Sequence, residues 1–166
     1  MRFTTRTEYG LVCLVYLARH VSSDMIKIKD IVKAERFSMT YVEKILQKLR
    51  AANIVISHQG KGGGYLLAKP SSEITLKEII EALEGGTFDV FCEPSVREHI
   101  VCTHLCLCGI TPVWAKTKRL LDEYYSSVTL EMVAQGGGNE KEPQKALAEN
   151  AMILERKQNG GESINS

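Results

Sequence analysis

The sequence lacks the features that would place the protein in or across a membrane. No run of apolar residues reaches the roughly 20 residues that span a bilayer as a helix. The first four residues include the polar Arg2 and Thr4, where a secretory signal peptide would carry its apolar core. We therefore expect a cytoplasmic protein with no membrane partner. Disulfides are disfavoured in that compartment, so clustered cysteines there indicate metal or redox chemistry.

The sequence also lacks the patterns that identify common classes of enzyme. The glycine-rich stretch 60–64 is followed by Tyr65, whereas a phosphate-binding P-loop needs a Lys-Ser/Thr pair and a helix at that point. No Cys-x-x-Cys precedes a βαβ pattern, and no nucleophile–base–acid set or cofactor fingerprint is present. We therefore expect that the protein is not an enzyme.

Net charge is nearly absent, at +1 for 166 residues, but the charge is unevenly divided. Residues 1–70 contain twelve Lys or Arg and five Asp or Glu, a surplus of +7. Residues 71–166 contain nine and fifteen, which leaves −6. A basic N-terminal half is the distribution expected of a protein that contacts nucleic-acid phosphates.

The basic half contains a capped helix that is followed by a hairpin. Thr40 and Glu43 have the Ser/Thr-x-x-Glu spacing of a capping box. Apolar residues then repeat at helical spacing and predict a buried face of Val42, Ile45, Leu46 and Leu49. A β-branched strand begins at Ile54, the glycines of 60–64 form a tight turn, and Tyr65 begins the returning strand. This order is the layout of a winged helix-turn-helix.

Further helices are predicted on both sides of this unit. Residues 4–20 form a helix in which Cys13 is a buried structural thiol, with a core face of Leu11, Leu14, Val15 and Ala18. A helix over 28–34 completes the helix-turn-helix pair, with Phe37 in the turn. Thr75 caps a helix over 76–83, Pro112 lies in the first turn of a longer helix to about Tyr125, and Thr129 caps a last short turn.

The long C-terminal helix carries a large apolar face made of Val113, Trp114, Thr117, Leu120, Leu121 and Tyr124. In so small a protein we expect this face to pack on a second copy, and a two-fold dimer suits a palindromic operator in double-stranded DNA. The fold class is therefore mainly α with a small β-hairpin wing. We expect a DNA-binding domain over 1–70, a helix, cysteine-rich loop and dimerisation helix over 71–134, and a polar, disordered tail over 135–166.

Four of the five cysteines, Cys92, Cys102, Cys106 and Cys108, lie within seventeen positions, with His99 and His104 among them. Thiolates bind soft metals, so zinc and an iron–sulfur cluster are the candidates. A structural zinc site usually pairs its ligands two to four residues apart in two separate knuckles. The spacing here lacks two such pairs, which favours a cluster. Reduced thiols in a poorly ordered loop are the remaining alternative.

These motifs resemble the IscR-type family of bacterial winged-helix transcription regulators. The similarity runs from Met1 to about Val133 and rests on Arg2-Phe3-Thr4, Tyr9-Gly10-Leu11, the residues of 38–43, the residues of 62–67 and Cys108-x5-Trp114. The resemblance implies a homodimer and an iron–sulfur cluster, 2Fe-2S in preference to 4Fe-4S, that changes which operators are bound. The expected role is a repressor or activator that senses iron–sulfur supply, iron, nitric oxide or redox state.

The resemblance also implies which residues hold the cluster, namely Cys92, Cys102 and Cys108. The family usually separates its three cysteines by five and five residues, whereas nine residues lie between the first two here. Thr111 replaces the family's histidine ligand, so the fourth ligand is open. Glu8 of the partner subunit stands at the position of an acidic ligand in some members, and Cys106, His104 and His99 are local candidates.

The expected DNA contacts divide between the recognition helix and its surroundings. Contacts with bases or phosphates in the major groove are assigned to Ser38, Thr40, Tyr41 and Lys44, and Glu43 is also assigned to DNA binding. Contacts with the DNA backbone are assigned to Lys48, Gln59, Lys61, Arg2 and Thr4. Gln59 replaces a family arginine that can enter the minor groove, and Lys61 supplies charge nearby. The alternative function is a winged-helix regulator without a cluster, whose cysteine loop binds zinc or responds by thiol oxidation or partner binding.

Overall fold

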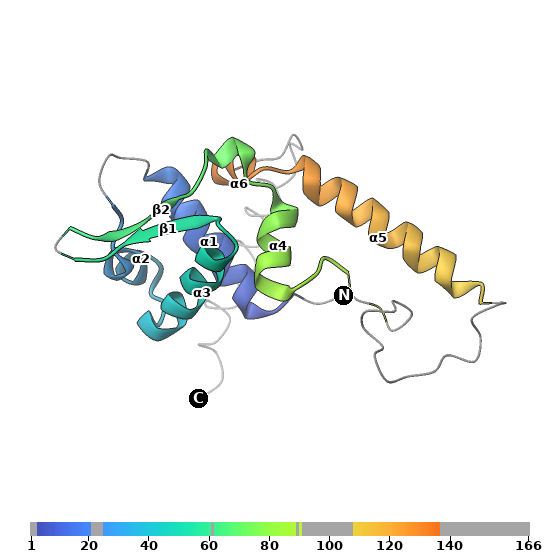
Figure 1. The fold of residues 1–166 in the computed structure, drawn as a ribbon, viewed down its shortest axis with the longest axis horizontal. Coiled ribbons are helices and arrows are strands. Elements are labelled where there is room, and N and C mark those ends of the chain that lie inside the picture. Colours follow the sequence, from blue (N-terminus) through green and yellow to red (C-terminus); the bar gives the residue numbers. More distant parts are fainter. Residues whose placement is uncertain (1–2, 21–24, 61, 89, 91–107, 137–166) are drawn as a thin grey trace, which may run out of the picture.

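The computed structural model describes residues 3–20, 25–60, 62–88, 90 and 108–136. The elements follow in the order α1 (Thr5–Arg19), α2 (Ile28–Glu35), α3 (Met39–Ala51), β1 (Val55–His58), β2 (Gly64–Leu67), a 3-10 turn (Ser71–Glu73), α4 (Leu76–Glu84), α5 (Ile110–Ser127) and α6 (Leu130–Ala134). Figure 1 shows α1–α4 and α6 gathered beside the hairpin, while α5 extends away from them. The prediction of a mainly helical, winged helix-turn-helix fold is confirmed.

The hydrophobic core lies between α1, α3, α4 and the hairpin. The predicted buried face of α3 is confirmed, because each of its four apolar residues is at most 1% exposed. Ile31 of α2, Val55 of β1, Leu83 of α4 and Leu130 of α6 complete the same cluster. Burial of one such side chain stabilises the fold by roughly 1.5–3 kcal/mol, so this cluster holds the helices and the wing together.

Helix α1 buries only part of the predicted face. Leu14 is fully buried as predicted, whereas Leu11, Val15 and Ala18 are partly buried and pack against the core. The other buried residues of this helix are Thr7, Gly10, Cys13 and Leu17. A Cβ atom on Gly10 would overlap the side chain of Leu83, so α1 approaches α4 most closely at this glycine. Because of this close approach, the side of α1 that carries Gly10 faces the core. The prediction that Cys13 is a buried thiol is confirmed.

Helix α3 begins before the predicted capping box, so that prediction is wrong. The extended residue at the N-terminus is Ser38, and its carbonyl accepts the first helical hydrogen bond from the N–H of Val42 at 3.0 Å. Thr40 lies inside the first turn and therefore has helical backbone angles rather than those of a cap. At the other end, Asn53 adopts a left-handed φ of 55°, which asparagine tolerates better than most residues, and the chain turns there into β1.

The wing is an antiparallel hairpin with a glycine turn, as predicted. Val55 pairs with Leu67 at its base and His58 pairs with Gly64 at its tip. The N–H of Gly63 donates to the carbonyl of Gly60 at 2.9 Å, and a Cβ atom on Gly63 would overlap the carbonyl of His58. Only glycine therefore fits this position of the turn. Lys61 lies outside the described residues.

Capping residues begin α4 and α6 as predicted. The N–H of Glu78 donates to Oγ1 of Thr75 at 3.2 Å, and Oε2 of Glu78 accepts from the N–H of Thr75 at 2.8 Å, which completes a capping box. Oγ1 of Thr129 accepts from the N–H of Met132 at 3.3 Å. The N–H of Leu130 also donates to the carbonyl of Ile74 at 2.8 Å, so the two helix starts lie side by side.

Helix α5 is longer than predicted, with Pro112 in its first turn. Its apolar face is open in the single chain, where Val113 is 55% exposed, Leu120 53% and Tyr124 61%. Among the described residues, no helix is long and apolar enough to cross a membrane. Of the tail predicted to be disordered, residues 135–166, the part from 137 to 166 lies outside the described residues.

Candidate nucleic-acid interface

Most of the residues predicted to contact DNA lie along the outer side of α3 and at its start. The exposed members are Ser38, Thr40, Lys44 and Lys48, and the half-buried members are Tyr41 and Glu43. In Figure 1, α3 and the hairpin lie toward one end of the protein and α5 projects from the other. The structure therefore brings these six side chains together on one helix whose opposite face is fixed in the core.

Three aromatic rings fix the position of Tyr41. The rings of Tyr9 and Phe37 stack with their centroids 4.0 Å apart, and the edge of Tyr41 packs on Tyr9 at 5.4 Å. Phe37 thus fills the helix-turn-helix turn as predicted. Each such pair contributes about 0.5–1.5 kcal/mol beyond the burial of its area. Tyr41 is consequently held at the start of α3 by its contact with Tyr9 of α1, and the ring of Tyr9 is itself stacked on Phe37 of the turn.

A basic notch lies between α1 and α3. It has a volume of about 550 Å³, and Arg6, Lys44 and Lys48 contribute its charge. Nη1 of Arg6 donates to the carbonyl of Leu83 at 3.2 Å, and Nζ of Lys48 lies 3.5 Å from the same oxygen. Sequence reasoning missed Arg6, because its contact with the end of α4 is separated from it by 77 residues.

The start of α1 is capped by a residue from α4. Oε1 of Glu84 accepts from the N–H of Thr4 at 3.1 Å and also from the hydroxyls of Thr4 and Thr7. Burial alone would raise the pKa of Glu84, but these hydrogen bonds and the charge of Arg6 together lower it. The Thr4 side chain makes no capping bond to α1 itself. Sequence reasoning missed Glu84 as well, since no local pattern joins residues this far apart.

The wing is attached to α3 by a further residue that the sequence did not reveal. Nη1 of Arg50, at the end of α3, donates to Oγ of Ser57 in β1 at 3.0 Å. Gln59, predicted to contact DNA, is exposed at the tip of the wing. Arg2 and Lys61, predicted to contact the DNA backbone, lie outside the described residues. The orientation of the wing relative to α3 is therefore set partly by a polar contact.

Of the residues predicted to hold a cluster, the structure describes Cys108 and Glu8. Cys108 is half-buried just before α5, where hydrogen bonds from the Thr111 hydroxyl and from nearby backbone N–H groups lower the pKa of its thiol. Glu8 is exposed on α1. Within the described ranges, no three His, Cys, Asp or Glu side chains gather to hold a metal ion. The other candidate ligands lie outside those ranges, namely Cys92, Cys102, Cys106, His104 and His99.

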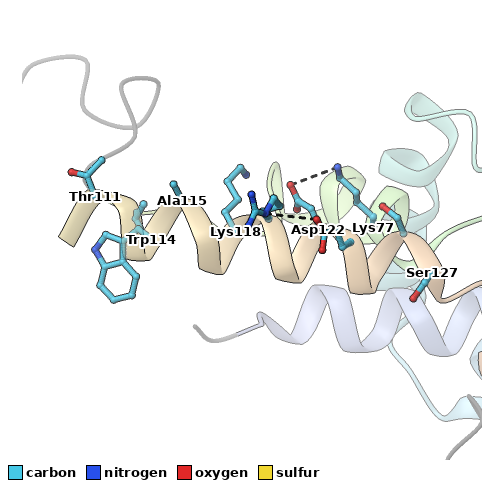
Figure 2. A pocket seen from close by; sticks show the side chains of 11 residues that line it. Lys77, Thr111, Trp114, Ala115, Lys118, Asp122 and Ser127 are labelled. Carbon is cyan, nitrogen blue, oxygen red and sulfur yellow. Dashed lines mark ion pairs between the residues drawn. The ribbon is translucent and has the colours of Figure 1, made fainter. Parts of the chain in front are cut away.

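A groove of about 900 Å³ runs along α5 on the side of the molecule away from the wing. Figure 2 shows its walls, with Trp114 near one end of the helix and Ser127 near the other. Nζ of Lys77 on α4 lies 3.6 Å from Oδ2 of Asp122 and joins α4 to α5 across the groove. The ring of Phe88 packs on Trp114 with the centroids 5.9 Å apart. The first residues after α4 are thus packed against α5.

The fold and the basic, polar surface of α3 beside a hairpin define a winged helix-turn-helix DNA-binding protein. The sequence matches a known family model over residues 3–136. That model is Rrf2, described as an iron-dependent transcriptional regulator. The chain belongs to the Rrf2 family of DNA-binding transcription regulators, and this membership confirms the expectation that it is not an enzyme.

Relatives of more than one kind share the fold and much of the length. The chain is 31% identical over 130 residues to the protein rrf2 of Nitratidesulfovibrio vulgaris, which covers 78% of this chain and 85% of that protein. It is 30% identical over 131 residues to the HTH-type transcriptional regulator IscR of Photorhabdus laumondii, covering 79% and 77%. The structure of CymR, the global cysteine regulator of B. subtilis, matches with a TM-score of 0.63 at 28% identity and covers 83% of this chain and 99% of that chain.

Proposed function

We propose that the protein is a homodimeric regulator that binds a palindromic operator in double-stranded DNA. The observation that carries this proposal is the exposed polar and basic side of α3 beside the hairpin. In this proposal α3 enters the major groove with the residues Ser38, Thr40, Tyr41, Glu43 and Lys44. The DNA backbone is held by Lys48 of α3, by Gln59 and Lys61 of the wing, and by Arg2 and Thr4 before α1.

The exposed face of α5 supports the homodimer. Val113, Leu120 and Tyr124 are each more than half exposed, and Ile110 at the start of the helix is 55% exposed. A contiguous apolar face of this kind normally marks an interface. Paired α5 helices would place two α3 helices on one side of a duplex, with half-sites about one helical turn apart. The proposed parts are 1–70 for DNA binding, 71–134 for sensing and dimerisation, and a disordered tail over 135–166.

We further propose that the segment between α4 and α5 holds an iron–sulfur cluster, 2Fe-2S in preference to 4Fe-4S. Its ligands would be Cys92, Cys102 and Cys108, with Glu8 of the partner subunit, Cys106 or His104 as the fourth. The half-buried thiol of Cys108, whose pKa is lowered, fits a thiolate ligand, and so does the cysteine-rich donor set. When bound, a cluster supplies a metal centre whose charge changes with its oxidation state and whose ligands can be exchanged. Cys108 lies directly before α5, so a change in its ligation would bear on that helix.

A second candidate is a regulator without a cluster, in which the same segment binds zinc or responds by thiol oxidation or partner binding. The observation that favours it is the similarity to CymR, which is about as strong as the similarity to IscR. Anaerobic purification separates the two candidates. A brown protein with visible absorption, iron and acid-labile sulfide supports the cluster, whereas a colourless protein free of iron and sulfide contradicts it.

DNA binding is tested by selecting a binding site from a random duplex library and then measuring affinity as a function of salt. Lys44→Ala should weaken binding and reduce the salt slope by about one, because one phosphate-neutralising charge is lost. Lys116→Ala, which removes the same charge from an exposed position on α5, is the matched control. If no sequence is enriched and no duplex binds at low salt, the proposed function is wrong.

A further inference from the structure

The notch between α1 and α3 has the charge of a phosphate-binding site. Its three cations, Arg6, Lys44 and Lys48, come from two helices and converge on a cavity of about 550 Å³. Among the residues that the structure describes, no carboxylate lines this notch, and none of the three cations forms an ion pair. The charge of Glu84 interacts with Arg6 from outside the notch, but no carboxylate of the described residues lies in its lining. Three cations that converge on such a lining favour an anion, and a nucleic-acid backbone supplies one at regular intervals.

Arg6 is held in the notch in a way that leaves most of its guanidinium free. Nη1 donates to the carbonyl of Leu83 at 3.2 Å. A guanidinium has five N–H donors in a planar fork, so one anchored N–H leaves donors for a bidentate bond to a phosphate. The same carbonyl lies 3.5 Å from Nζ of Lys48. Carbonyls at a helix C-terminus carry partial negative charge, which helps to keep two like charges close together.

The next residue of α4 fixes the turn of α1 that carries Arg6. Glu84 accepts from the N–H of Thr4 at 3.1 Å and from the hydroxyls of Thr4 and Thr7, which lie on either side of Arg6 in sequence. These bonds attach the first turn of α1 to the end of α4. Leu83 and Glu84 therefore determine together where Arg6 lies relative to α3.

We propose that this notch binds one phosphate of the DNA backbone, with Arg6 as its principal ligand and Glu84 as the residue that positions Arg6. The inference rests on the proposed DNA-binding function and adds to it a contact from α1. Phosphate contacts are independent of base sequence. The site can therefore be tested with a fluorescein-labelled duplex of mixed sequence before any operator is known.

The first experiment measures fluorescence anisotropy of this duplex with the full-length protein over a range of salt concentrations. Arg6→Ala should weaken binding about tenfold at low salt and lower the salt slope by about one. Arg6→Lys should keep the slope, because the charge remains, but recover only part of the affinity, because the fork is lost. Arg119→Ala, at an exposed site on α5, is the matched control and should leave both quantities unchanged.

The second experiment separates the positioning role of Glu84 from its charge. Glu84→Ala and Glu84→Gln remove the same negative charge, which by itself would strengthen binding to DNA. Gln keeps an oxygen that can accept from Thr4 and Thr7, whereas Ala does not. We expect the Glu84→Ala protein to bind DNA about threefold more weakly than the Glu84→Gln protein. When Arg6 is also replaced by Ala, the two Glu84 variants should bind equally, because coupled residues behave in this way in a double-mutant cycle.

The outcomes distinguish this inference from the proposed function. If Arg6→Ala behaves like Arg119→Ala while Lys44→Ala weakens binding, the phosphate site is wrong and DNA binding stands. If Glu84→Ala and Glu84→Gln bind alike, Glu84 has no positioning role. Thermal melts at equal protein concentration identify any variant that fails to fold. If Arg6→Ala fails to fold, the comparison of Arg6→Lys with the unmodified protein still decides the assignment of Arg6. If the unmodified protein binds no duplex, the proposed function itself fails.

Discussion

The hydroxyl of Thr87 donates a hydrogen bond to Oδ1 of Asp122 and so joins the segment after α4 to the middle of α5. Thr87 is only 3% exposed, so its hydroxyl depends on this partner. The other oxygen of Asp122 lies 3.6 Å from Nζ of Lys77 on α4. Asp122 thereby attaches the projecting helix to the body of the protein at two points, of which Figure 2 shows the ion pair with Lys77.

Replacement of Asp122 by Ala should lower the free energy of unfolding by about 1–3 kcal/mol, because it leaves the buried Thr87 hydroxyl without a partner. Urea unfolding followed by circular dichroism at fixed protein concentration measures the change. Glu123→Ala is the control, since Glu123 forms an exposed i,i+4 pair with Arg119 and such pairs contribute about 0.5 kcal/mol or less. Equal losses in the two variants would show that the bond to Thr87 contributes nothing.

Gly64→Ala should destabilise the wing by at least about 1 kcal/mol. A Cβ atom at this position would lie 2.5 Å from the carbonyl oxygen of Ile26, which is backbone and can yield only if Ile26 moves away from β2. The N–H of Tyr65 also donates to that carbonyl at 2.8 Å, so the clash would break this bridge. Hydrogen exchange of the hairpin amides and urea unfolding measure the loss.

Gly109→Ala is the matched control for the change at Gly64, because a Cβ atom on Gly109 meets open space. Its effect should be no more than several tenths of a kcal/mol, the difference between Gly and Ala at a helix N-terminus. Unchanged protection of the hairpin amides in Gly64→Ala would contradict the close approach between β2 and Ile26.

Local patterns in the sequence were sufficient for much of the fold. The buried face of α3, the hairpin and the cap of α4 by Thr75 each depend on residues a few positions apart, and all three were predicted correctly. The face of α1 was predicted only in part, with Leu14 correct, because the contact between Gly10 and Leu83 also decides it and these two residues are far apart in the chain. Sequence patterns carry no signal for such an approach.

The same division holds for the candidate site. The exposed residues of α3 were predicted from helical spacing and charge. Arg6, Arg50 and Glu84 were missed, because their roles depend on contacts with other elements, as far as 80 residues away for Glu84. The assignment of cluster ligands in the cysteine-rich segment stays a prediction that metal analysis must test.

The hydrogen bonds to Glu84 make the stability of the α1–α4 contact dependent on pH. They lower the pKa of this carboxyl despite its partial burial, so the folded state favours the charged form more than the unfolded chain does. The resulting stabilisation is present above the unfolded pKa of about 4.5 and is lost as the pH falls through the folded pKa. When the pH is lowered from neutral to below 4.5, the free energy of unfolding should therefore fall less for Glu84→Gln than for the unmodified protein. Glu131→Gln, at an exposed site on α6, is the matched control for the loss of one carboxylate.

The thiol of Cys13 makes stability depend on pH in the opposite direction. Burial within α1, with a smaller contribution from the charge of Glu35, raises the pKa of Cys13 from 9.0 to about 12. Between these values the unfolded chain loses the thiol proton and the folded protein keeps it, so stability that is full below pH 9 falls as the pH rises. The expected contribution to the slope is about 1.4 kcal/mol per pH unit.

Other groups also titrate in this range, so the measurement is a comparison between the unmodified protein and Cys13→Ala. Urea unfolding over the alkaline range should give a shallower decline for Cys13→Ala, although the variant is less stable overall because it leaves a small cavity in the core. In the unmodified protein, Cys13 should also resist alkylation at pH 8 until urea unfolds the chain, since the neutral, buried thiol is unreactive. Two results would contradict this expectation: parallel pH profiles for the two proteins, or rapid alkylation of Cys13 in the folded state. Either would show that this thiol is accessible to solvent and that α1 packs against the core more loosely than the structure indicates.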